Sequence, residues 1–355
     1  MQRITSFGLA GCLCSYPVLA APLDALLTAK HASTPGEIEL EVSYDLVNNA
    51  VDIFNIRGSD ATYAGTNVGD YHGAHVRAGI AVTSDIWVDG ALWQRRLDYR
   101  ADLLTINTWQ VGAQYKLLGE ASGYQPSLAL RVGAWGNYSA ALNKSSPTTV
   151  RGQTLSSVTV NKPNDAQVQV DLIGSTRLFN QLDFSVYGGA GVSQVKVKSV
   201  NGTAALGGCS YALTFTPQAV LGICSSGDGF LIPNKIYGID VYNEAQYKAS
   251  FASGGMSATW QQQNWLLRGG YQFQRINRGQ IDATIQKRGG ITYETNHVFL
   301  GEVMYRVLRN TAIFVRGQYM TNQFVGEIPF AYNTMTASRF DKHYGILSTG
   351  LAFGF

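Results

Sequence analysis

Eight charged residues alternate with apolar neighbours along short segments of this chain, and they are the first candidates for chemistry. They are Arg77, Lys116, Arg131, Asp171, Arg268, Glu302, Arg306 and Arg316. Cations and carboxylates that meet inside a protein either pair with one another or line a path for polar solutes. Two interpretations are therefore open for Arg268, Glu302 and Arg316: a structural ion-pair network, or a selectivity ring for a small polar or anionic solute.

Residue types that support catalysis or bind metals show no matching arrangement. The His-x-Ser pattern of lipid-cleaving membrane enzymes occurs at His31-Ala32-Ser33, but Pro35 follows it and no regular segment holds it. Four other histidines fall near the ends of different segments, which is more typical of solvated side chains than of a metal site. These are His72, His75, His297 and His343. We expect no enzyme activity, no metal and no cofactor.

The N-terminus predicts export from the cytoplasm. Arg3 precedes an apolar stretch that ends at Val18-Leu19-Ala20, so residues 1–20 have the form of a signal peptide cleaved after Ala20. An alternative is a lipoprotein signal, because residues 9–12 read Leu-Ala-Gly-Cys. On the first interpretation Cys209 and Cys224 are the cysteines that remain. Exported proteins meet an oxidising compartment, so we predict a disulfide between these two.

Composition excludes several classes of protein. Charged residues make up 14% of the chain, the net charge is +3, and no Lys/Arg run is present, so nothing indicates a nucleic-acid partner. Beyond the N-terminus no apolar stretch has the length of a membrane helix. A membrane barrel is still allowed, because its lipid-facing residues alternate with polar ones.

The elements that position the charged residues are predicted strands. From Gly36 onward twelve segments alternate apolar and polar residues, as in 37–46, 109–117 and 265–273, and no helical period is convincing. Short links alternate with long ones, at 48–70, 98–105, 140–165, 198–245, 276–294 and 321–342. An even strand number with links sorted by length favours an all-β transmembrane barrel over a soluble β-sandwich. We therefore assign 21–35 to a short periplasmic segment and 36–355 to one antiparallel up-and-down barrel.

The C-terminal residues 345–355, "GILSTGLAFGF", are alternately large and small. They resemble the C-terminal signature of Gram-negative outer-membrane β-barrel proteins, which the barrel-assembly machinery reads. The resemblance assigns this role to Tyr344, Leu351, Phe353 and Phe355 and implies an outer-membrane location. It also implies contact with outer-membrane lipid and lipopolysaccharide. It covers about a dozen residues and indicates no narrower family.

A barrel of about twelve strands lies between small filled barrels and wide porins. We expect a narrow, porin-like channel for passive diffusion of small hydrophilic solutes. The alternative is a non-conducting barrel whose long loops mediate adhesion or ligand binding. The segment 198–245 is the candidate plug, because it is the longest link and contains apolar residues around the predicted disulfide. The sequence indicates neither the solute nor the oligomeric state.

Overall fold

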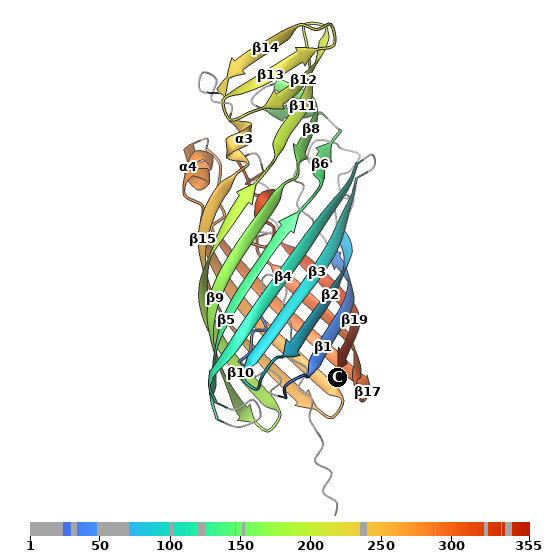
Figure 1. Cartoon of the computed structure of the whole chain (residues 1–355), viewed down its shortest axis with the longest axis vertical. Coiled ribbons are helices and arrows are strands. Elements are labelled where there is room, and N and C mark those ends of the chain that lie inside the picture. Colours follow the sequence, from blue (N-terminus) through green and yellow to red (C-terminus); the bar gives the residue numbers. More distant parts are fainter. Residues whose placement is uncertain are drawn as a thin grey trace, which may run out of the picture.

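A computed structural model shows a closed barrel of twelve antiparallel strands with an additional sheet at one end (Figure 1). The residues it describes are 24–29, 34–47, 71–99, 102–119, 125–145, 147–150, 153–234, 240–287, 289–322, 326–334, 336–337 and 343–355. The predicted signal peptide, the lipoprotein alternative, the His-x-Ser triplet and link 48–70 lie outside the described residues.

The wall of the barrel consists of twelve strands, and each contains one of the twelve alternating segments of the sequence. In chain order the strands are β1 (Ile38–Val47), β2 (Tyr71–Ala81), β3 (Ile86–Tyr99), β4 (Asp102–Leu118), β5 (Ser127–Tyr138), β9 (Asn164–Phe179), β10 (Leu182–Lys196), β15 (Tyr247–Gln262), β16 (Trp265–Asn277), β17 (Thr295–Leu308), β18 (Thr311–Met320) and β19 (Tyr344–Gly354). Neighbours in this order are hydrogen-bonded, as in an up-and-down barrel. The predicted fold class is confirmed.

Pairing of β1 with β19 closes the barrel. Their register runs from Glu39 opposite Gly354 to Val47 opposite Ile346. The backbones of Ile38 and Phe355 exchange two hydrogen bonds, of 3.0 Å and 2.9 Å. Closure satisfies the backbone groups of both edge strands, which lipid cannot do.

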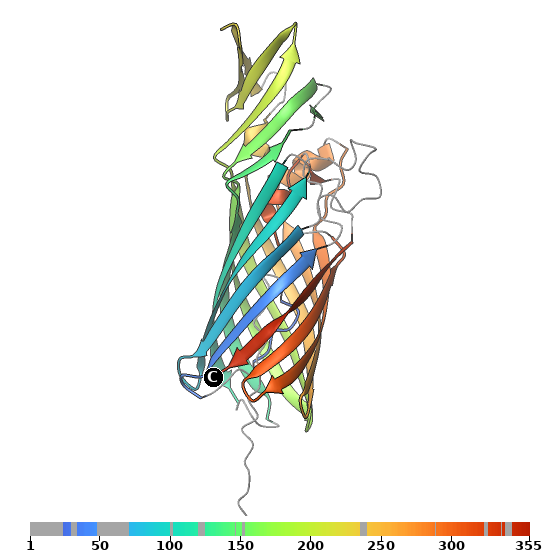
Figure 2. The ribbon, with the colours of Figure 1, turned by 90° about the vertical axis from the view of Figure 1, so that its right-hand side faces the viewer.

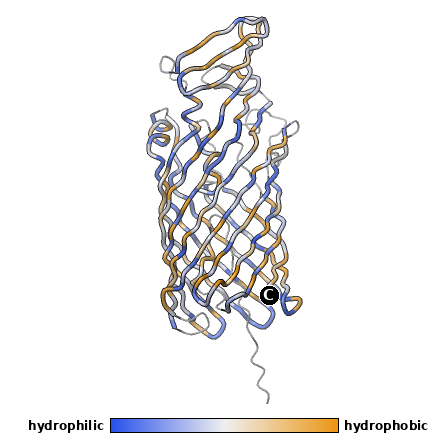
Figure 3. Tube along the Cα trace, viewed as in Figure 1, coloured by the Kyte–Doolittle hydropathy of each residue, from blue (hydrophilic) through white to orange (hydrophobic). Residues whose placement is uncertain are grey.

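The two faces of the wall differ as the period-2 pattern predicts. Outward side chains include Val42, Leu172, Val315 and Leu351, each more than 40% exposed. Apolar and polar residues alternate along the strands in Figure 3. Aromatic side chains form two clusters on the outer face: Trp265 lies 4.7 Å from Tyr305 near the short turns, and Tyr271, Phe299 and Tyr319 form a row nearer the other end. Such girdles are typical of barrels in a bilayer.

The additional sheet lies beyond the end of the barrel where the long links emerge (Figures 1 and 2). Its strands are β6 (Ala141–Lys144), β7 (Thr148–Val150), β8 (Gln153–Asn161), β11 (Ser199–Leu206), β12 (Cys209–Phe215), β13 (Ala219–Cys224) and β14 (Gly229–Pro233). Cys209 and Cys224 form the predicted disulfide across the β12–β13 hairpin, with Cα atoms 6.0 Å apart. The apolar residues of this segment pack on one another and on helix α3 (Val241–Glu244), so the sheet core explains their presence.

Segment 198–245 is therefore not the plug. Its described residues form strands β11 to β14 of the outer sheet and helix α3, and a different link, described below, enters the barrel. The expected long link at 98–105 is also wrong, because β3 extends to Tyr99 and β4 begins at Asp102. Both strands extend beyond the residues in which apolar and polar side chains alternate regularly, and the sequence analysis placed the strand ends at the limits of that alternation. Link 276–294 contains helix α4 (Gln280–Lys287). Among the described residues no helix is long and apolar enough to cross a membrane.

Candidate functional site

The middle of the barrel interior contains a network of ion pairs. Register places Arg268 opposite Glu302 and Glu302 opposite Arg316, on β16, β17 and β18. Arg268 Nε donates to Glu302 Oε1 at 2.8 Å, and Arg316 Nε donates to Glu302 Oε2 at 2.8 Å. Arg316 also binds Glu41 of β1 with two hydrogen bonds, of 3.0 Å and 2.9 Å. All four side chains are buried. The contacts join β16, β17 and β18 directly, and the Arg316–Glu41 pair passes over β19 to reach β1 across the barrel seam.

A second ion pair passes over a strand. Arg131 on β5 donates to both carboxylate oxygens of Asp89 on β3, at 2.6 Å and 2.8 Å. Strand β4 lies between them, and its inward-facing residue at this level is Gly112. A Cβ atom at Gly112 would collide with the Arg131 guanidinium. Glycine at this position is what allows the pair to form.

A histidine forms a third group of contacts. His75 Nε2 lies 2.9 Å from Glu41, and its Nδ1 lies 2.7 Å from Asp45. The Ser43 hydroxyl is 2.8 Å from the same Nδ1 and 3.0 Å from Asp45. Because a carboxylate faces each ring nitrogen, the imidazole is not free to act as a base toward Ser43. His75 is buried inside the barrel, so its expected place among solvated rim histidines is wrong.

Of the remaining predicted interior residues, Arg77 lies beside this network and the others lie apart from it. Lys116 is near the short turns, where it binds the Ser84 carbonyl at 2.7 Å and Asp85 at 3.1 Å. Arg306 is half-buried at the same end of β17, and Asp171 accepts from Gln169 in the interior. Arg77 is 1% exposed, and its nearest carboxylate oxygen, on Glu41, is 3.9 Å away. The structure thus brings Arg268, Glu302 and Arg316 together, as expected from their positions.

Residues 24–29, which we expected in the periplasm, lie inside the barrel. Their backbone is bound by inward side chains of several strands. Tyr187 donates to the Asp24 carbonyl at 2.9 Å, and Ser257 donates to the Leu27 carbonyl at 2.9 Å. Gln114 donates to the Thr28 carbonyl at 3.1 Å, and the Ala29 amide donates to the Ser175 hydroxyl at 2.8 Å. A Cβ atom at Gly270 would overlap the Ala25 carbonyl, so this inward glycine makes room for the segment. We call residues 24–29 the N-terminal plug.

A second segment enters from the end with the long links. Residues 326–334 and 336–337, here called the loop plug, include the short helix η2 (Pro329–Ala331) and are almost all buried. The Tyr247 hydroxyl donates to the Pro329 carbonyl at 2.7 Å, and the Phe330 amide donates to Asp165 at 3.2 Å. Arg95 pairs with Glu327 at 2.7 Å. This part of link 321–342 fills the interior in the way we had predicted for 198–245.

The loop plug is surrounded by apolar side chains that point inward from the wall. They include Leu104, Trp135, Phe251, Ile276, Val298 and Met320, and they pack with Ile328, Phe330 and Tyr332. A smaller apolar cluster around Leu266, Met304 and Phe314 lies toward the short turns. The interior is therefore polar in its middle and apolar on both sides, whereas the sequence analysis treated all inward positions as polar.

Helix α4 fastens the loop plug at its outer end. The Tyr332 hydroxyl donates to Asp282 at 3.1 Å, and the Arg278 guanidinium lies 3.9 Å from the centre of the Tyr332 ring. Burial raises the pKa of the Tyr332 hydroxyl to about 12. Tyr332 is therefore a neutral hydrogen-bond donor over the physiological pH range.

Asp24 of the N-terminal plug carries a carboxyl group in an unusual environment. Its Oδ1 accepts from the Leu26 amide at 2.7 Å, and its Oδ2 is buried without a hydrogen-bond partner among the described residues. Burial raises the pKa of this carboxyl to about 6, although the Leu26 amide and the positive charges of Arg77, Arg131 and Arg316 oppose the increase. Asp24 therefore changes charge close to neutral pH.

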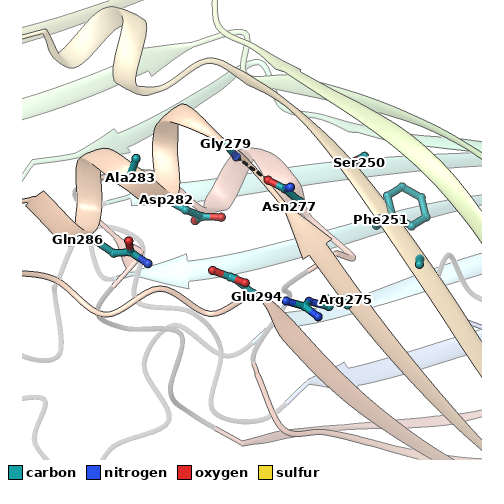
Figure 4. Close-up of a pocket in the computed structure, with 10 residues that line it drawn as sticks. Ser250, Phe251, Arg275, Asn277, Gly279, Asp282, Ala283, Gln286 and Glu294 are labelled. Carbon is teal, nitrogen blue, oxygen red and sulfur yellow. Dashed lines mark hydrogen bonds between the residues drawn. The ribbon is translucent and has the colours of Figure 1, made fainter.

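A cavity of about 530 Å³ lies outside this network, between β15, β16 and helix α4 (Figure 4). Arg275, Asn277, Gln286 and Glu294 line it with exposed polar groups. No group of three or more His, Cys, Asp or Glu residues suitable for a metal occurs in the part of the chain that the structure describes. Asp282 of helix α4 belongs to its lining and binds Tyr332, so the cavity adjoins the outer end of the loop plug rather than the ion-pair network.

Sequence reasoning missed both plugs, Asp24, Asp89 and the His75 contacts. Asp89 and His75 each lie between apolar neighbours in their strands, so the period-2 pattern is consistent with their inward position. The plugs give no such signal, because short irregular segments reveal their burial only through the wall that surrounds them. A weak signal existed in "GEIPFAY" at 326–332, which is unusually apolar for a link.

No model of a protein family matches the chain, and no curated protein matches it. Solved structures with a similar arrangement include the translocator domain of autotransporter NalP from Neisseria meningitidis, with 10% identity, a TM-score of 0.48 and coverage of 92% of this chain and 91% of that one. The Ralstonia pickettii toluene transporter TbuX has 10% identity, a TM-score of 0.40 and coverage of 95% of each chain. The KdgM porin has 5% identity and a TM-score of 0.39, covering 89% of this chain and 99% of that one. Likenesses at this level transfer no function.

The class of the protein follows from its own geometry. Twelve strands close without a free edge, the outer face is apolar and carries aromatic clusters at two levels, and the interior is ionic in the middle. A water-soluble fold would not expose such a face on every strand of its wall. The chain is a twelve-stranded β-barrel protein of the bacterial outer membrane.

Proposed function

We propose that this protein is a narrow channel for passive diffusion of small hydrophilic solutes and that the structure represents its closed state. The observation that supports the proposal most is the way the N-terminal plug is held. Four hydrogen bonds from the wall reach its backbone, and the segment adds no strand to the wall. A segment of this kind can leave while the barrel stays intact.

The ion-pair network fits a bracing role better than a selectivity ring. Glu302 and Glu41 already occupy the hydrogen-bonding groups of Arg268 and Arg316, so these arginines have little left for a passing solute. The structure brings the three residues together but does not test their role in transport. We propose that the transported solutes are small and polar. We also propose that the barrel-assembly machinery recognises the C-terminal residues.

Conductance in planar lipid bilayers tests the proposal. We expect the purified protein to give rare openings, and a variant with Ser175→Ala, Ser257→Ala and Tyr187→Phe to open more often, because three contacts to the plug are removed. Ser250→Ala, on the outer face, is the matched control and should behave like the original protein. Silence of both the original protein and the triple variant would contradict channel function.

The outer sheet favours a second function, the binding of a partner at the cell surface. Leu221, Ile223 and Leu231 point to the same side of β13 and β14, and Ile223 and Leu231 are more than 60% exposed. A barrel that never conducts and binds through this sheet is the alternative to a channel. We propose no catalytic role, because the Ser43–His75 contact lacks a free base, as argued above.

A further inference from the structure

The middle of the interior contains an arginine, Arg77, with two guanidinium nitrogens that form no hydrogen bond to a described residue. Arg77 is 1% exposed, and its Nε and Nη2 atoms have no hydrogen-bond partner among the residues that the structure describes. The charge of the guanidinium is balanced in part by Glu41, 3.9 Å from Nη1. Leaving such donors unpaired in the interior is costly, so a polar partner from outside the chain is favoured.

The two unused groups lie on one edge of the guanidinium plane. The Nε–H and Nη2–H bonds point in the same direction, and this is the edge that binds both oxygens of a carboxylate at once. Arg177 uses this edge to bind both carboxylate oxygens of Asp183, each at 3.0 Å. Arg131 and Arg316 bind Asp89 and Glu41 with two hydrogen bonds as well, but through their Nη1 and Nη2 atoms. Among the described arginines of the interior, Arg77 alone has both groups of this edge vacant.

The N-terminal plug brings a carboxylate into electrostatic range of Arg77. Asp24 interacts electrostatically with Arg77, and its Oδ2 atom is also without a hydrogen-bond partner. The plug carboxylate therefore compensates the charge of Arg77 without forming the two-pronged contact. A free carboxylate is not held by the plug backbone, so it can approach the Nε–Nη2 edge and form this contact once the plug has left.

We propose that Arg77 is the binding site for small organic carboxylates in this channel and that Asp24 occupies the neighbourhood of the site while the N-terminal plug is docked. The inference rests on the proposed channel function and names its solute class. Anion binding at Arg77 and docking of the plug compete, so a bound carboxylate favours release of the plug and thereby opens the channel that it passes through. Arg77 takes the place that the sequence analysis gave to Arg268 and Arg316.

Saturation-transfer NMR on acetate tests the site without requiring conductance. The full chain in detergent, carrying the triple plug substitution defined above, should transfer saturation to the acetate methyl group at pH 7.5. Arg77→Lys keeps the charge but loses the two-pronged edge, so we expect binding to weaken about tenfold, the effect of losing one charge-assisted hydrogen bond. Arg96→Lys, on the outer face, is the matched control and should bind like its parent.

The outcomes separate this inference from the proposed function. Equal acetate signals in the Arg77→Lys protein and its parent would overturn the site, as would an equal loss in the Arg96→Lys control. Bilayer openings together with either result would leave the channel intact and refute only its carboxylate site. Acetate binding that depends on Arg77 in a protein that never conducts would support the site and refute the channel. Heat-dependent migration in SDS gels checks that each variant is folded.

Discussion

Docking of the N-terminal plug should strengthen as the pH falls from 8 to 5. Burial holds the pKa of Asp24 at about 6 in the docked state, against an ordinary value of 3.8. The docked plug therefore binds more protons than the released plug between these two values. Linkage then makes docking most favourable below about pH 4 and weakens it as the pH rises through about 6.

The size of the effect follows from the two pKa values. At pH 5 the docked carboxyl is about nine-tenths protonated and the released one is mostly ionised, which favours docking about tenfold, or about 1.4 kcal/mol, relative to pH 8. The groups that act on Asp24 electrostatically are Arg77, Arg131 and Arg316, and none of these arginines titrates in this range.

Hydrogen exchange at the Ala29 amide measures plug docking, because this amide donates to Ser175 in the docked state. We expect its protection factor, corrected for intrinsic exchange, to be about tenfold higher at pH 5 than at pH 8. Asp24→Asn removes the titrating group and should abolish the difference. A protection factor that does not change with pH in the original protein would refute the reasoning, and so would the same change in the Asp24→Asn protein.

Three further predictions concern the wall and the loop plug. Glu302→Gln leaves Arg268 and Arg316 partly unpaired, and we expect a loss of about 3–5 kcal/mol, read as a lower unfolding temperature in heat-modifiability gels. Val315→Arg places a charge on the lipid face and should cost about 2–4 kcal/mol in urea-driven unfolding from vesicles, whereas Val315→Leu should be neutral; equal stability of the two variants would argue against lipid contact. Tyr332→Phe removes the hydrogen bond to Asp282 and should destabilise docking of the loop plug by about 1 kcal/mol. We expect faster hydrogen exchange at the Phe330 amide, and an unchanged exchange rate would argue against this contact.

The wall was predictable because its constraint is local and repeated. Alternation of apolar and polar residues identified every strand of the barrel, and the pairing of Ile38 with Phe355 confirms the closure expected from the C-terminal strand. Strand ends were less certain: at Tyr99 and Asp102 the strands continue although the alternation weakens. Hydrogen bonding to the neighbouring strand, rather than the side-chain pattern, determines where these strands end.

The contents of the interior were predictable only in part. Alternation placed Arg268, Glu302 and Arg316 among the polar residues of their strands, and the register of β16, β17 and β18 brings them together. The alternation of Leu213 and Phe215 has the same form in an outer sheet as in a barrel wall, so it could not show where segment 198–245 lies. The plugs depend on contacts between residues far apart in the chain, such as Ala29 with Ser175, for which one sequence contains no local signal.

A reversible tether between the plug and the wall tests the central claim most directly. The hydroxyl oxygens of Thr28 and Ser175 are 3.4 Å apart, so Thr28→Cys with Ser175→Cys should form a disulfide in a background with Cys209→Ser and Cys224→Ser. We predict that the oxidised protein never opens in planar bilayers and that reduction restores the openings seen without the tether. Openings of equal frequency and size before and after reduction would contradict an N-terminal segment that closes the barrel from within.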